Sequence, residues 1–75
     1  DFLAAAKELE PGYQVARLRM LRGLTQAQLA EMVGSRQPSI AKLENGTGAP
    51  SLSFLTKIAE ALGAKIEFKL IPDTK

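Results

Sequence analysis

Three polar side chains near the middle of the chain have the types and spacing needed to hydrogen-bond with DNA. Ile40 and Leu43 have the spacing of an inward helix face, and Gln37, Ser39 and Lys42 then project outward together. A glutamine amide can bond adenine through two atoms, and a lysine ammonium can donate to guanine. An outward Gln or Ser is otherwise a plainly hydrated side chain. The spacing alone leaves both interpretations open.

Catalytic chemistry has almost no suitable residues in this chain. Its 75 residues include no Cys and no His, which excludes disulfides, thiolate chemistry, the usual zinc sites and the commonest general base. The eight acidic residues are scattered rather than paired. We therefore expect no enzyme activity, no metal and no cofactor.

Charge and composition limit the remaining classes of protein to which the chain could belong. The net charge of +2 and the pI near 9.2 are compatible with a nucleic-acid partner but argue for one only weakly. The hydrophobic fraction of 45% is that of a globular domain. With no membrane-length apolar run and no signal peptide, we expect a cytoplasmic protein without a membrane partner. Because the chain begins at Asp1 without an initiator Met, we expect it to be a trimmed piece.

Two short helices joined by a glycine-containing turn are expected to position the polar residues. Thr25 and Gln28 form a capping-box pattern at the start of the first helix, and Gly34 ends it. The second helix spans about 36–44. Asn45-Gly46 could be a hairpin turn, but no alternating strands flank it, which favours a helix C-cap. The inward faces are Leu29, Ala30 and Val33 of the first helix and Ile40 and Leu43 of the second.

Further helices are expected on both sides of this pair. Residues 2–9 have helix-forming composition, and a break at Glu10-Pro11-Gly12 separates them from a helix over about 11–22. Ser51 is a good N-cap for a last helix that ends at Gly63. The apolar stripe of this last helix is Leu52, Leu55, Ile58, Ala59 and Leu62.

Over 64–71 the apolar residues no longer follow a helical period and instead alternate with polar ones. Ile66, Phe68 and Leu70 share one face, which predicts a half-buried strand that ends at Pro72. A lone strand leaves its backbone groups without partners, and no other segment has a strand pattern. Pairing with the same strand of a second copy solves this, so we predict a homodimer. The alternative is a frayed, extended tail.

The motifs in order resemble those of the Cro/cI-like (XRE) helix-turn-helix family, from about Leu18 to Leu62. The lead-in Leu9-Glu10-Pro11 and the basic-hydrophobic strand ending in Pro72 look most like the DNA-binding domain of HigA-type antitoxins. The matching motifs are Gly23-Leu24-Thr25-Gln26, Leu29-Ala30, Gly34, Gln37, Ile40, Leu43-Glu44-Asn45-Gly46, Pro50-Ser51-Leu52 and Ala59-Leu62-Gly63.

This resemblance implies a role for individual positions. Gln26 matches a residue that contacts a phosphate, and Gln37 matches the first base-reading residue. Asn45 matches a residue near the end of the recognition helix that contacts the DNA backbone. Arg19 and Glu44 match a structural ion pair. The implied DNA-binding set is Gln26, Arg36, Gln37, Ser39, Lys42 and Asn45.

Three departures from the family pattern stand out. Pro38 occupies a place where relatives often read a base, and its side chain cannot hydrogen-bond. Arg36 stands where a Ser or Thr N-cap is frequent, so capping is expected to shift to Ser35. The loop 47–49 lacks the basic residues that many relatives direct at phosphate.

Together these patterns predict an all-α helix-turn-helix domain of about five helices with a C-terminal strand that pairs across a dimer. Its parts are a helical extension over 1–10, the domain over 11–63 and a dimerising strand and tail over 64–75. The expected function is a sequence-specific repressor that binds a double-stranded DNA operator. The resemblance further implies the antitoxin of a RelE/HigB-like toxin that autoregulates its operon. The alternative is a protein-interaction module without DNA recognition.

Overall fold

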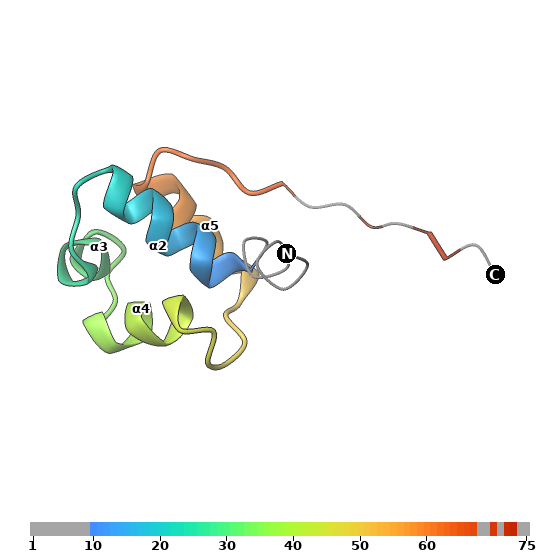
Figure 1. Ribbon diagram of the computed structural model, residues 1–75, viewed down its shortest axis with the longest axis horizontal. Coiled ribbons are helices and arrows are strands. Elements are labelled where there is room, and N and C mark those ends of the chain that lie inside the picture. The colour runs from blue at the N-terminus through green and yellow to red at the C-terminus, as the bar shows by residue number, and fades with distance from the viewer. Residues whose placement is uncertain (1–9, 68–69, 71, 74–75) are drawn as a thin grey trace, which may run out of the picture.

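The structure, a computed structural model, describes residues 10–67, 70, 72 and 73. Within these residues it contains four helices and no strand (Figure 1). The predicted helix over 2–9 lies outside the described residues. The four helices are α2 (Pro11–Leu21), α3 (Gln26–Met32), α4 (Gln37–Glu44) and α5 (Leu52–Ala61).

Helices α3 and α5 begin at the predicted capping residues. In α3 the capping box is complete: Gln28 N donates to Thr25 Oγ1 at 3.0 Å, and Thr25 N donates to Gln28 Oε1 at 2.8 Å. Ser51 Oγ accepts from the backbone N–H of Phe54 at 3.1 Å and so caps α5. Gly34 has a φ of 69°, which lets the chain turn from α3 towards α4.

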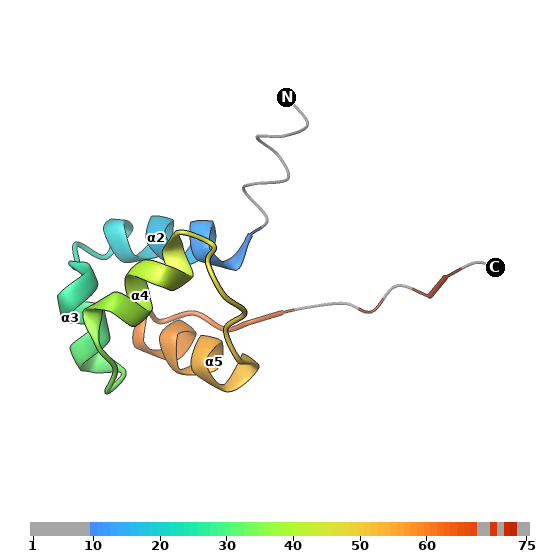
Figure 2. The same ribbon diagram turned by 90° about the horizontal axis from the view of Figure 1, so that it is seen from below.

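The core lies where α3, α4 and α5 meet, and α2 packs along α4 beside it (Figure 2). Val15 and Leu18 of α2 pack against this core. The inward residues predicted for α3 and α4 lie in it, although Val33 is only half-buried. Leu52 differs from the prediction, because it is 54% exposed in the first turn of α5. The buried core residues are Leu29, Ala30, Ile40, Leu43, Ile58 and Leu62.

Gly12 sets how closely α2 approaches α4. It is the buried residue of α2, and a Cβ placed on it lies 2.1 Å from the carbonyl oxygen of Leu43. That atom belongs to the backbone of α4 and cannot rotate away. The sequence indicates a helix break around this glycine, whereas the structure gives it a packing role inside the first turn of α2.

We expect Gly12→Ala to destabilise the domain, although alanine is the better helix former. The added methyl group forces α2 away from α4, and overpacking of this kind costs about 1–3 kcal/mol. In a domain of this size that lowers the melting temperature by on the order of 10 °C, which thermal unfolding followed by circular dichroism measures. Ser53→Ala, at the exposed second position of α5, is the matched control. Equal melting temperatures for Gly12→Ala and the parent would contradict the close approach.

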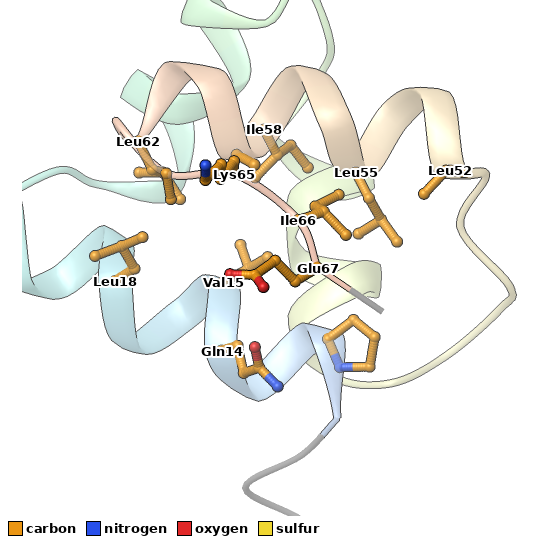
Figure 3. Close-up of a pocket in the computed structure, with 13 residues that line it drawn as sticks. Gln14, Val15, Leu18, Leu52, Leu55, Ile58, Leu62, Lys65, Ile66 and Glu67 are labelled. Atoms are coloured by element: carbon orange, nitrogen blue, oxygen red, sulfur yellow. The ribbon is translucent and has the colours of Figure 1, made fainter. Parts of the chain in front are cut away.

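After α5 the chain runs back along the groove between α2 and α5. Ala64 N donates to Ala59 O at 2.8 Å, and the next residues pass over an apolar groove of about 530 Å³. Val15 of α2, Leu55 of α5 and Ile66 of the returning segment line this groove together (Figure 3). The end of α5 is therefore followed by a segment that lies against the helical body.

The predicted strand over 64–71 is not present in the described part of this segment, 64–67 and 70. Among the described residues no other extended segment offers it a partner, and a strand needs one. Phe68 lies outside the described residues. Ile66 is 39% exposed and Leu70 is 88% exposed, so neither is covered as the predicted strand requires.

Candidate nucleic-acid interface

Helix α4 presents the polar residues singled out in the sequence on its exposed side. Gln37 is its first residue, and Ser39 and Lys42 are also exposed. Ile40 and Leu43 are buried on the opposite side, so the outward placement of the three polar residues follows from the packing. Such a surface has the donors and acceptors that base edges can meet in a major groove.

The two ends of α4 differ in their capping. The N-cap position is occupied by Arg36 and not by Ser35, so the expected shift of the cap to Ser35 is wrong. The side chain of Arg36 makes no cap hydrogen bond. Pro38 lies in the first turn, where its lack of an N–H costs little. At the other end Asn45 is the C-cap, and Gly46 has a φ of 74°, so the helix C-cap is confirmed. An uncapped helix start suits a phosphate.

Arg19 of α2 and Glu44 of α4 form the ion pair that the resemblance implies. Arg19 Nε lies 2.7 Å from Glu44 Oε2, and Arg19 NH2 lies 3.0 Å from Glu44 Oε1. Their side chains are 12% and 6% exposed, so the pair is largely out of water. Arg19 NH1 also donates to the carbonyl of Leu24 at 2.7 Å. The hydrogen bond to Glu44 raises the pKa of Arg19 above its ordinary value, and burial opposes that rise.

Gln26 and Gln37 contact each other directly, which the sequence alone did not indicate. Gln37 Nε2 donates to Gln26 Oε1 at 2.7 Å, and Gln26 Nε2 donates to Glu44 Oε1 at 2.9 Å. Capping and helical period placed each glutamine at the start of its own helix. Whether two such starts meet depends on the packing of α3 against α4, which no local pattern specifies. The structure thus joins the expected phosphate contact, the expected base reader and the ion pair in one network.

Two side chains near this surface hold the ends of helices in place. Arg22 Nε donates to the carbonyl of Leu62 at 2.9 Å and ties the end of α2 to the end of α5. Thr47 Oγ1 donates to the carbonyl of Lys42 at 3.1 Å. The loop after α4 therefore supports the helix end, and it contributes no cation.

The described residues contain no group of three or more side chains suited to hold a metal ion. Across the same part of the chain, none of the helices has the length and apolar character needed to cross a membrane.

Comparisons with known proteins agree with this geometry. The model of the Helix-turn-helix family matches residues 15–69. An uncharacterized HTH-type transcriptional regulator of Archaeoglobus fulgidus is 40% identical over 60 residues, which cover 80% of this chain and 86% of that protein. The cryptic phage CTXphi transcriptional repressor RstR of Vibrio cholerae is 39% identical over 54 residues, 72% of this chain and 48% of that repressor.

A solved structure shows the same arrangement. The restriction-modification controller protein C.AhdI of Aeromonas hydrophila superposes with a TM-score of 0.72 at 30% identity, over 80% of this chain and 87% of that one. The family match over residues 15–69 includes the helix pair α3 and α4 and the buried core residues. The chain therefore belongs to the helix-turn-helix family, in its Cro/cI-like (XRE) branch, a family of DNA-binding regulators and not of enzymes.

Proposed function

We propose that this DNA-binding regulator is a sequence-specific repressor that acts by occupying a double-stranded DNA operator. The observation that carries the proposal is the exposed polar face of α4, held outward by the burial of Ile40 and Leu43. Repression by occupancy needs no catalytic group. It also agrees with the likeness to RstR, whose name describes a phage transcriptional repressor.

The residues of the interface divide into two groups by what they can contact. Gln37 is the base reader, with Ser39 and Lys42 on the same side of α4. Gln26 and Asn45, together with Arg36, are the residues that we assign to the DNA backbone. Phosphate contacts position a protein on DNA without carrying sequence information, whereas contacts to base edges carry it.

Replacing Gln37 with alanine is expected to weaken binding to the preferred operator by about 1–3 kcal/mol and to relax discrimination at one base position. Asn45→Ala is expected to weaken binding to all sequences about equally, since a contact to the DNA backbone is the same at every sequence. Lys42→Ala separates its two possible contacts: a changed base preference identifies a base contact, and a salt slope reduced by about one unit identifies a phosphate contact.

The measurement is competition binding at two salt concentrations. The preferred operator is first selected from a random duplex library, and single-base variants of it then compete for each protein. Ser53→Ala, at an exposed position of α5 outside the proposed interface, is the control that should leave both affinity and base preference unchanged. If Gln37→Ala ranks every variant as the parent does, α4 does not read bases and the repressor proposal fails.

We further propose that the protein acts as a homodimer through the segment 64–71. Ile66 and Leu70 carry exposed apolar surface in the single chain, and together with Phe68 they form the predicted apolar face. Pairing the same segment from two copies satisfies the backbone groups of both and covers this face. A two-fold dimer also presents two copies of α4 to one duplex.

Removing the chain after Gly63 is expected to give a monomer with much weaker operator binding. The helices end before this point, so the truncated protein should keep the helical circular dichroism of the parent. Light scattering measures the oligomeric state, and titration with the selected operator measures the binding affinity. A truncated protein that remains dimeric places the interface elsewhere.

The finer proposal is that the protein is the cytoplasmic antitoxin of a RelE/HigB-like toxin. Its support is the resemblance of the Leu9-Glu10-Pro11 lead-in and of the segment ending in Pro72 to HigA-type antitoxins. Coexpression with the toxin encoded beside its gene, where one is present, should restore growth and yield a complex of both proteins. Growth arrest unaffected by coexpression contradicts this role and leaves the repressor proposal intact.

The second candidate is a protein-interaction module, and one surface favours it. Met20 and Leu21 are 62% and 70% exposed, and Tyr13 is 37% exposed, all on α2. If the competition experiment shows no sequence preference in the parent, this apolar surface becomes the main candidate for function.

A further inference from the structure

The network between α3 and α4 has a fixed direction. Gln37 donates to Gln26, and Gln26 donates to Glu44, with the nitrogen-to-oxygen distances of 2.7 and 2.9 Å. Glu44 is itself held by two hydrogen bonds from Arg19. The residue that ends α4 is thus connected, through a residue of α3, to the residue that begins α4.

The direction follows from the ionised partner at its inner end. A carboxylate paired with a guanidinium can only accept hydrogen bonds, so Gln26 must turn its NH2 group towards Glu44. The other end of the Gln26 amide is its carbonyl oxygen, which also only accepts. Gln37 must therefore direct its NH2 group at Gln26. One N–H and the Oε1 of Gln37 remain available to a ligand.

We propose that Glu44 is a positioning residue for base recognition, because it fixes through Gln26 which way round the Gln37 amide is held. The inference rests on the proposed function of Gln37. Adenine offers a donor and an acceptor in the major groove, which match the acceptor and the donor left on Gln37. Guanine offers two acceptors, one of which meets Gln37 Oε1 unfavourably. An amide free to rotate can instead turn an N–H to guanine O6.

Two variants separate this role from a purely structural one. Glu44→Gln keeps the size of the side chain but can donate as well as accept, so the direction of the network is lost. Arg19→Lys weakens the two-atom contact of the ion pair but leaves Glu44 as a carboxylate. Both variants are expected to lower the melting temperature. Only Glu44→Gln is expected to change how strongly adenine is preferred over guanine.

The first measurement uses the free protein and does not depend on DNA. In nuclear magnetic resonance spectra of the parent, the Gln37 side-chain amide should show contacts to the Gln26 side chain and slow exchange with water. Arg19→Lys should keep these signals, and Glu44→Gln should lose the contacts and exchange several-fold faster. All spectra are recorded well below the melting temperature of the less stable variant. Unchanged Gln37 signals in Glu44→Gln overturn the proposal.

The second measurement is the ratio of affinities for adenine and guanine at the base position that Gln37→Ala identifies. The parent is expected to prefer adenine by about tenfold or more, and Arg19→Lys to keep that ratio. Glu44→Gln is expected to reduce it to about threefold or less. Equal weakening on all operators means that Glu44 acts on stability alone, which overturns the inference. A parent without any sequence preference overturns the proposed function instead, while the spectra still decide how the amide is held.

Discussion

Arg19→Met is expected to destabilise the fold by about 3 kcal/mol, a drop in melting temperature on the order of 15 °C for a domain of this size. The reason is the burial of the partner. Glu44 has a side chain only 6% exposed and loses both hydrogen bonds from Arg19, so an uncompensated charge remains between α2 and α4. Methionine has a similar length, so little packing is lost. Thermal unfolding followed by circular dichroism measures the change.

Arg17→Met is the matched control, because Arg17 lies exposed on the same helix. Its replacement should change the melting temperature little. The double variant Arg19→Met/Glu44→Leu adds a second check, since an apolar pair in place of a buried ion pair often restores stability. We expect it to be more stable than Arg19→Met alone. Equal melting temperatures for Arg19→Met and Arg17→Met contradict the assigned role of the pair.

The shift of the Arg19 pKa also has a defined consequence for pH. The folded-state pKa is raised, so the stability that comes from Arg19 is complete below its unfolded pKa and is lost only as pH rises through the folded value. That window lies in strong alkali. The parent and Arg19→Met should therefore differ by the same amount throughout the neutral range.

Local signals in the sequence were sufficient to place most of the helix ends. Thr25 and Ser51 cap because a side-chain oxygen can reach a nearby backbone N–H whatever the rest of the fold does. The burial of Ile40 followed from helical period in the same way. These features depend on neighbours within one turn of helix, which a sequence displays directly.

Features that depend on two helices meeting could not be obtained in this way. Gly12 has the same local pattern whether or not Leu43 lies against it, and only the packing of α2 on α4 makes its missing side chain necessary. The bond between Gln26 and Gln37 likewise joins the starts of two helices. Arg19 and Glu44 were paired only through the family resemblance, because residues 25 apart carry no periodic signal.

Inserting half a helical turn between the two halves of the selected operator is expected to weaken binding by at least about a hundredfold. In the proposed dimer, the two copies of α4 are held at a fixed spacing by the segments 64–71. Five extra base pairs, about half a turn, rotate one half-site to the opposite side of the duplex, so only one α4 can bind. The second α4 is then no longer brought to its half-site by the binding of the first, so the gain in affinity from two linked contacts is lost. Gel mobility shifts or fluorescence anisotropy on the two duplexes measure the loss.

Two controls make this result specific to the dimer. The protein truncated after Gly63 should bind both duplexes with equal, weak affinity, because a monomer occupies each half-site alone. Parent protein on a duplex with a single half-site should match its own affinity for the inserted duplex. If the insertion leaves the affinity of the parent unchanged, the two α4 helices are not rigidly linked. The segment 64–71 then does not hold the dimer that operator recognition requires.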